Sequence, residues 1–259
     1  MKQIVGILAL AVILNGTGTA KMQRETVEYR SGEVVLEGYL AYDDALTGKR
    51  PGVLVIHEWK GLNDYARSRA DQLAQLGYVA FALDMYGKGI RPQTNEEASA
   101  RAGSLYKELS LMRNRANAGL EVLRKQPNVD TARLAVIGYC FGGKTALELA
   151  RSGANLKGVV SFHGTLSTPN PDHARHIRSK VLVCHGASDP HVPAEQVVAF
   201  ENEMTSAKVD WQLIAYGGAV HGFTNPANGN DPSQGVAYDE KADKRSWEAM
   251  RQFFDEVFR

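Results

Sequence analysis

The chain has 259 residues, 44% of them hydrophobic, and its 30 basic and 29 acidic residues give a formal net charge of +1. This length fits one α/β domain, and the hydrophobic fraction is typical of a globular core. The balanced charge argues against a nucleic-acid partner, which would need a strongly basic surface. No repeat, low-complexity tract or block of like charge divides the sequence, so we expect a single domain over residues 21–259.

The first 20 residues have the three-part pattern of a secretory signal peptide. Lys2 makes a short positive start, residues 4–14 are uninterruptedly apolar, and small residues lead to a cleavage point after Ala20. The apolar stretch is too short for a comfortable membrane span. We therefore expect a periplasmic or secreted protein with no stable membrane insertion once residues 1–20 are removed. Two alternatives stay open: an uncleaved anchor, or translation from Met22, which would leave a cytoplasmic protein.

The first half of the remaining chain alternates strand and helix patterns. Residues 25–42 alternate like a β-hairpin that turns at Ser31-Gly32. Residues 53–56 and 79–83 are predicted as buried strands on either side of a helix over 64–76. A further helix begins near Thr94 and continues toward Lys125.

The second half continues the same alternation. Apolar runs predict strands at 133–137, 158–162, 180–184 and 210–216, and helices are expected after Phe141, Pro193 and Ala237. Strands that alternate with helices indicate an α/β fold, in which a mainly parallel central sheet is flanked by helices on both faces.

The segment 134–143 predicts a candidate nucleophile. A strand-like run stops at Gly138, Cys140 follows two residues later, and Gly142 begins a helix. This is the strand–turn–helix pattern G-x-nucleophile-x-G of the nucleophile elbow, with cysteine where serine is usual. At the helix N-terminus, the dipole and free N–H groups favour a thiolate and a developing oxyanion. The alternative is a tight turn that carries a buried cysteine.

An acid and a histidine follow in the order of the α/β-hydrolase fold. Asp189 lies in a loop after the apolar run 181–184, and His221 lies in a loop after the run 211–216. Nucleophile, acid and histidine in this order, each beyond the end of a strand, predict a Cys-His-Asp triad. Taken singly, Asp189 is also a common turn former before Pro190, and His221 an ordinary loop residue.

Four blocks of sequence carry a family resemblance, which runs from about Glu33 to the C-terminus. They are His57-Glu58-Trp59-Lys60-Gly61-Leu62-Asn63, Gly138-Tyr139-Cys140-Phe141-Gly142-Gly143, His185-Gly186-Ala187-Ser188-Asp189 and Val220-His221-Gly222-Phe223-Thr224-Asn225-Pro226. In these blocks the chain resembles the dienelactone hydrolase (carboxymethylenebutenolidase-like) family of the α/β-hydrolase superfamily. The resemblance implies a hydrolase that cleaves a lactone or carboxylic ester through a covalent acyl-cysteine intermediate.

The resemblance also implies further site residues. It gives Glu58 a place beside the cysteine, where the glutamate helps to form the thiolate when substrate arrives. One oxyanion donor, the backbone N–H of Phe141, follows from the elbow itself. The resemblance places the second donor on the backbone N–H of Trp59. His57 is expected to have a structural role.

Substrate contacts depart from the family pattern. Family members that act on dienelactone hold its carboxylate with arginines, and the resemblance places Lys88 and Asn225 at the two corresponding positions. A lysine keeps the charge without the bidentate fork, and an asparagine keeps neither. Arg91 is a candidate to compensate. A neutral or differently charged ester, thioester or lactone is therefore as well predicted as dienelactone.

No metal or cofactor is expected. The other histidines form no H-E-x-x-H pattern, and Cys184 in its apolar strand is predicted to be buried and unpaired with Cys140. The expected partner is a small-molecule substrate, and we expect a monomer. Two other functions stay open, a non-catalytic binding protein on the same fold and thiol redox chemistry at Cys140. The absence of a C-x-x-C pair weighs against redox chemistry.

Overall fold

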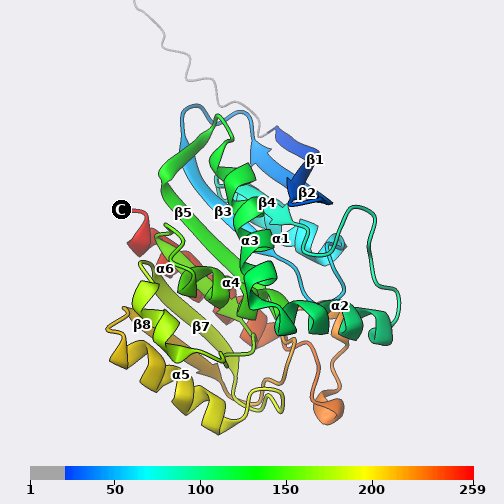
Figure 1. Ribbon diagram of the computed structural model, residues 1–259, viewed down its shortest axis with the longest axis vertical. Coiled ribbons are helices and arrows are strands. Elements are labelled where there is room, and N and C mark those ends of the chain that lie inside the picture. The colour runs from blue at the N-terminus through cyan, green and yellow to red at the C-terminus, as the bar shows by residue number, and fades with distance from the viewer. Residues whose placement is uncertain (1–20) are drawn as a thin grey trace, which may run out of the picture.

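A computed structural model describes residues 21–259 as one eight-stranded sheet with helices on both sides (Figure 1). The strands lie in the order β1-β2-β4-β3-β5-β6-β7-β8. Their bounds are β1 Met22–Ser31, β2 Val34–Asp43, β3 Arg50–Ile56, β4 Val79–Leu83, β5 Val129–Tyr139, β6 Gly158–Phe162, β7 Lys180–Gly186 and β8 Trp211–Tyr216. Strands β3 to β8 pair in parallel, while β1 and β2 are antiparallel. The predicted α/β fold with a mainly parallel sheet is confirmed.

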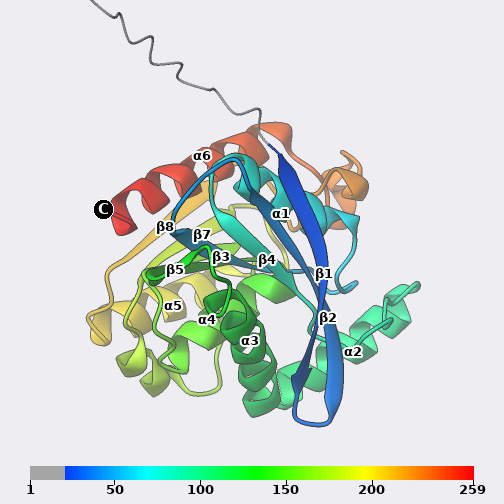
Figure 2. The same ribbon diagram turned by 90° about the horizontal axis from the view of Figure 1, so that it is seen from above.

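The helices divide into two layers. Their bounds are α1 Asp64–Gln75, α2 Asn95–Lys107, α3 Leu109–Arg124, α4 Phe141–Arg151, α5 Ala194–Ser206 and α6 Glu240–Val257. Helices α1 and α6 cover one face, and α3, α4 and α5 cover the other (Figure 2). Alternation along each strand explains the two cores: in β3, Leu54 and Ile56 face one core while Val53 and Val55 face the other.

Side-chain caps begin the helices that border the site. The Asn63 side chain accepts a hydrogen bond from the Ala66 N–H at the start of α1, and Asp239 accepts one from Ala242 at the start of α6. Both satisfy backbone donors that a helix cannot satisfy internally. The two caps fix where α1 and α6 begin.

The predicted helix from Thr94 to Lys125 is two helices. Glu108 has φ −114° and ψ 70°, which ends α2 and turns the chain into α3. Neither a proline nor a glycine occupies position 108. The helical periodicity of the sequence therefore predicted one continuous helix. Just before the break, the Tyr106 ring packs 5.6 Å from that of Phe141 beside the elbow. β5 is also longer than predicted and starts at Val129.

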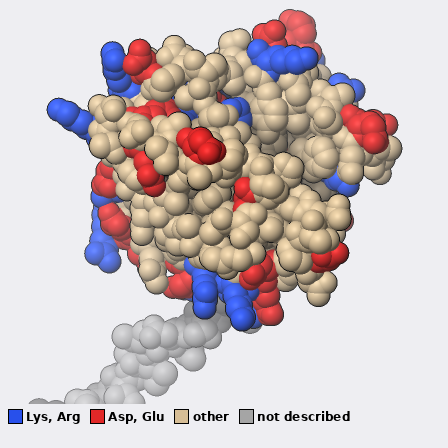
Figure 3. All heavy atoms as spheres, turned by 90° about the horizontal axis from the view of Figure 1, so that it is seen from below, with Lys and Arg blue, Asp and Glu red and all other residues tan. Residues whose placement is uncertain are grey.

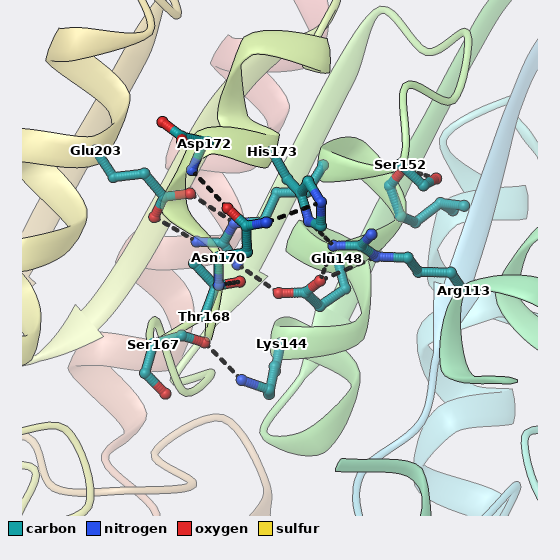
Figure 4. A network of polar contacts seen from close by, with 12 residues as sticks. Arg113, Lys144, Glu148, Ser152, Ser167, Thr168, Asn170, Asp172, His173 and Glu203 are labelled. Carbon is teal, nitrogen blue, oxygen red and sulfur yellow. Dashed lines mark hydrogen bonds and ion pairs between the residues drawn. The ribbon is translucent and has the colours of Figure 1, made fainter. Parts of the chain in front are cut away.

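A buried network of ion pairs anchors the C-terminal half of α4 (Figure 4). Arg151 is fully buried, donates to Glu148 at 3.0 Å and binds both carboxylate oxygens of Glu203 at 2.7 and 2.8 Å. Arg113 donates to the other oxygen of Glu148 at 2.6 Å. Two arginines and two glutamates neutralise each other in a region that excludes water. The network ties α3 and α5 to the helix that begins at the nucleophile.

Within residues 21–259, no helix has both the length and the apolar character needed to span a membrane. The predicted signal peptide, residues 1–20, lies outside the described part of the chain.

Candidate active site

Cys140 lies in the sharp turn between β5 and α4. Its φ of 53° and ψ of −114° are in a region that non-glycine residues rarely adopt. The close packing requires glycine on either side: a Cβ on Gly138 would lie 2.0 Å from the Gly142 carbonyl oxygen, and one on Gly142 would lie 2.2 Å from that of Ile56. The predicted strand–turn–helix is therefore present, with Cys140 at its tip.

His221 connects Cys140 to Asp189. Its Nε2 lies 3.0 Å from the Cys140 Sγ, and its Nδ1 lies 2.8 Å from the Asp189 Oδ2. The other Asp189 oxygen accepts the backbone N–H of His191 at 2.8 Å, which orients the carboxylate. The three predicted residues, which come from loops after β5, β7 and β8, are thus brought together at hydrogen-bonding distance.

The charges around His221 favour its protonated form. Burial alone would lower its pKa, but the facing Cys140 sulfur and the Asp189 carboxylate raise the pKa of His221 to about 10. An imidazolium next to the sulfur stabilises a thiolate, and the N-terminus of α4 adds a positive dipole end. The geometry thus places a protonated His221 against the Cys140 sulfur.

Glu58 is buried and is held by Asn225. The Asn225 side-chain amide donates to its Oε2 at 2.6 Å, a contact between residues 167 positions apart. Burial raises the pKa of Glu58, and the Asn225 hydrogen bond and the His221 charge partly offset this. The structure therefore brings Asn225, predicted at a substrate-binding position, onto the predicted helper acid.

His57 stabilises the loop that follows β3. Its Nε2 accepts the backbone N–H of Met85 at 3.2 Å, so Nδ1 carries the proton and donates to the Glu58 carbonyl at 2.5 Å. Burial lowers the pKa of His57 to about 4, so the ring is neutral at neutral pH. The Tyr86 hydroxyl donates to the Trp59 carbonyl at 2.8 Å. These bonds agree with the structural role expected for His57.

The two predicted oxyanion donors are available. Within residues 21–259, neither the Trp59 nor the Phe141 backbone N–H donates to another protein group. The two residues border the turn at Cys140 from the ends of β3 and β5.

Lys88 and Arg91 form their polar contacts away from the Cys140, His221 and Asp189 side chains. Lys88 is exposed and forms an ion pair with Glu28 on β1. The Arg91 guanidinium donates to the Ile90 carbonyl at 2.9 Å and faces Asp84 at 3.8 Å. In the described chain, neither Lys88 nor Arg91 forms a hydrogen bond or an ion pair with Cys140.

The sequence did not single out a cluster around Thr224. The Thr224 hydroxyl contacts Tyr65 on α1 at 2.5 Å and His163 after β6 at 2.7 Å, and its carbonyl accepts from Arg69 at 2.7 Å. The sequence signal that could have identified Thr224 was its position between His221 and Asn225 in one of the family blocks. His163 is one of the histidines that form no metal-binding pattern in the sequence.

Among residues 21–259, no group of three or more histidine, cysteine or acidic side chains is arranged to hold a metal ion. Cys140 and Cys184 are both free thiols, and Cys184 is fully buried, as predicted.

The parallel sheet, the elbow and the aligned cysteine, histidine and aspartate define the class of protein as an α/β-hydrolase. Residues 36–258 match the dienelactone hydrolase family, and the chain belongs to that family. It is therefore a hydrolase of the carboxylic ester and lactone type.

Known proteins resemble the whole described chain. The crystal structure of P91, a dienelactone hydrolase-like promiscuous phosphotriesterase from metagenomic libraries, has a TM-score of 0.88 and 44% identity, covering 92% of this chain and 99% of its own. The structure named m3DLH also has a TM-score of 0.88, with 46% identity over 91% and 98% of the two chains. A Synechocystis sp. protein provisionally named as a carboxymethylenebutenolidase is 25% identical over 251 residues, which are 91% of this chain and 98% of that one.

Proposed function

We propose that this protein cleaves a small lactone or carboxylic ester through an acyl-cysteine intermediate on Cys140, with His221 as acid and base and Asp189 orienting it. The observation that carries the proposal is the 3.0 Å contact between the Cys140 sulfur and a histidine that Asp189 holds from the other side. A nucleophile, a base and an orienting acid in hydrogen-bonding reach are the parts that acyl transfer needs.

The reaction proceeds in two halves. The Cys140 thiolate attacks the carbonyl carbon, and the Trp59 and Phe141 N–H groups stabilise the oxyanion. The His221 imidazolium then protonates the leaving oxygen as the carbon–oxygen bond breaks, which leaves a thioester. In a lactone the released hydroxyl stays attached to the acyl group. His221 next takes a proton from water, the hydroxide attacks the thioester, and the acid and the free cysteine are released.

Glu58 serves the first half as a helper base. Its burial raises its pKa, which brings its proton affinity closer to that of a thiol than an exposed glutamate would be. When the pair starts as a Cys140 thiol and a neutral His221, the Glu58 carboxylate leaves Asn225 as substrate arrives, takes the thiol proton and passes it to His221, which gives the thiolate and the imidazolium. The observation behind this role is that the Asn225 hydrogen bond holds the Glu58 carboxylate buried before substrate arrives.

The substrate we propose is neutral or carries little charge near the scissile bond. Asn225 is uncharged, and the charges of Lys88 and Arg91 are directed to acidic side chains. Seen from below, most of the face is neither acidic nor basic; a few acidic side chains lie within it, and the basic side chains lie mostly at its margin (Figure 3). A neutral phosphotriester is a second candidate, because the related P91 is named as a phosphotriesterase and the same uncharged site suits it.

The test is turnover of short-chain esters, a carboxylated lactone and a neutral phosphotriester by the parent and by Cys140→Ala. We expect turnover only by the parent, together with an acyl adduct on Cys140 in the intact mass after rapid quenching. Near-parental kcat in Cys140→Ala would rule out the nucleophile. Lack of turnover by the parent on all substrates would favour the binding-protein alternative.

We propose, in addition, that the protein acts outside the cytoplasm after removal of residues 1–20. The support is the Lys2, apolar 4–14 and Ala20 pattern. N-terminal sequencing of the protein from its host should find Lys21 first. An intact Met1, or a start at Met22 in the cytosolic fraction, would contradict export.

A further inference from the structure

Thr224 joins three elements behind the candidate site. It is 1% exposed and lies between His221 and Asn225 in the long segment that connects β8 with α6. Its carbonyl accepts the Arg69 guanidinium at 2.7 Å, and its hydroxyl lies 2.5 Å from the Tyr65 hydroxyl and 2.7 Å from the His163 Nε2. The segment that carries both functional side chains is thus attached to α1 on one side and to the end of β6 on the other.

The hydrogen bonds around Thr224 have one consistent direction. The Arg69 guanidinium can only donate, and its Nε–H points to the Tyr65 oxygen at 3.3 Å. Burial raises the pKa of Tyr65 well above its ordinary value, so Tyr65 keeps its proton. Because its oxygen accepts from Arg69, that proton can be donated to Thr224. The Thr224 proton is then left for the His163 Nε2. In this direction His163 accepts at Nε2 and carries its proton on Nδ1, a buried atom that has no hydrogen-bond partner among residues 21–259.

Arg69 is itself firmly held. It donates to Asp243 on α6 at 2.6 Å, and its guanidinium carbon lies 5.2 to 5.5 Å from the ring centres of Tyr65, Tyr139 and Trp247. A cation enclosed by three aromatic faces and one carboxylate has little freedom to move. It provides a rigid start for the chain of hydrogen bonds that ends at His163.

His163 reaches the triad. Its ring centre lies 5.4 Å from that of His221 at an angle of 70°, and its backbone has a φ of 40°, which the surrounding structure must impose. Burial lowers the pKa of His163 well below its ordinary value, and the charges of His221 and Arg69 act in the same direction. A neutral ring at this position allows a cationic His221 next to it.

We propose that the Thr224 hydroxyl is a positioning group for the triad: it fixes the His221 segment against Tyr65 and His163 and keeps the neutral His163 ring beside His221. Thr224 touches neither Cys140 nor Asp189 through a hydrogen bond in the described chain, so its effect passes through the placement of His221. This inference rests on the proposed function only in that His221 must serve Cys140.

Several charged or titratable groups surround His221, and the test must separate them. Those that contact it or act on it through their charge are Cys140, Asp189, His163, His191, His185 and Glu58. Thr224 variants leave all six in place. A changed titration in those variants therefore reports the position of His221 and the state of His163.

The experiment compares Thr224→Val, which keeps the shape and removes the hydroxyl, with Thr224→Ser, which keeps the hydroxyl. Ultraviolet absorbance of the thiolate and the rate of Cys140 alkylation by iodoacetamide are followed against pH, and kcat and KM are measured on a short-chain ester. We expect Thr224→Val to lose about tenfold in kcat with little change in KM, because a small misplacement of a catalytic group costs rate. The midpoint of alkylation should move to higher pH than in the parent, since a misplaced His221 stabilises the thiolate less.

Thr224→Ser should restore the parental titration and most of the rate. Parental titration and kcat in Thr224→Val, or an equal defect in Thr224→Ser, would overturn the proposal. If Thr224→Val does not fold, Tyr65→Phe replaces it: this variant removes the donor to Thr224, and we expect the same upward shift, smaller in size. An unchanged titration in Tyr65→Phe would likewise contradict the proposal. Alkylation needs no substrate, so a parent that turns over no ester still tests this inference while contradicting the proposed function.

Discussion

Asn225 and Glu58 form a buried hydrogen bond between an uncharged amide and an acid whose pKa is raised by burial. The family resemblance implies an arginine at position 225, which would place a charge beside both Glu58 and the incoming substrate. With asparagine, no unpaired guanidinium faces an uncharged acyl group. At the scale of single residues, we therefore expect the charge at position 225 to affect which substrates bind.

Asn225→Arg should reverse the preference between charged and neutral substrates. We expect a lower KM for a carboxylated lactone, because the guanidinium binds its carboxylate. We expect a higher KM for a neutral ester, because the guanidinium must lose water without gaining a charged partner. The measurement is kcat/KM for one anionic and one neutral substrate on both proteins. A parent that already strongly prefers the anionic lactone would contradict the prediction, and Lys88→Ala and Arg91→Ala would then show which residue provides the charge.

His221 and Asp189 should behave as one unit. We expect His221→Ala to reduce kcat by several orders of magnitude and Asp189→Asn by somewhat less, because the acid acts only through the histidine. The double variant should then be little worse than His221→Ala. Steady-state kinetics of the three variants, with Cys140→Ala as the background rate, makes the comparison. If the fold-losses in kcat of the two single variants multiply in the double variant, the two residues act separately.

The element that sets the site is the β5–turn–α4 unit. The start of α4 leaves no room for a side chain at Gly138, and the end of β3 leaves none at Gly142. Cys140 lies between these two glycines in its uncommon backbone conformation. The ion network of Arg151, Glu148 and Glu203 then fixes the far end of α4. The nucleophile is thus strained locally and stabilised from both ends of the unit.

Gly142→Ala should disrupt this unit. The new Cβ would lie 2.2 Å from the Ile56 carbonyl oxygen, a backbone atom that cannot move without shifting β3. We expect loss of activity and a clearly lower free energy of unfolding. The matched control is Gly103→Ala in α2, where a Cβ meets nothing within 4 Å. There we expect a gain of about 0.5–1 kcal/mol from helix propensity. The measurements are the free energy of unfolding in urea and kcat for both variants. A fully active Gly142→Ala would contradict the packing argument.

At the scale of the whole molecule, the sheet with helices on both faces buries histidines whose protonation the folded state disfavours. His57 is fully buried with a pKa of about 4, and His163 is shifted in the same direction. An unfolded histidine titrates near its ordinary value of 6.5. Above that value both states are neutral and His57 has no pH effect. As pH falls from 6.5 toward 4, the unfolded state gains a proton that the folded state refuses, so stability decreases.

We therefore expect acid to destabilise the parent more than His57→Gln. The contribution of His57 should be a loss of about 2 kcal/mol between about pH 7 and about pH 5, from the proton that only the unfolded state takes up. Glu58 and His221 titrate in both proteins and cancel in the comparison. The measurement is the free energy of unfolding in urea at both pH values. Equal pH dependence in the two proteins would show that His57 is not neutral in the folded state.

Sequence alone determined the strand–turn–helix at Cys140, the order of Asp189 and His221, and the α/β alternation, because these depend on local periodicity and on glycines within a few residues. The family blocks added Glu58 and the oxyanion donors. Only the tertiary structure decided that Asn225 binds Glu58, that Lys88 turns to Glu28, and that Thr224 meets Tyr65 across 159 positions. Such pairs have no local signal, since their partners come from different loops that meet only when the sheet has assembled and both its faces are covered.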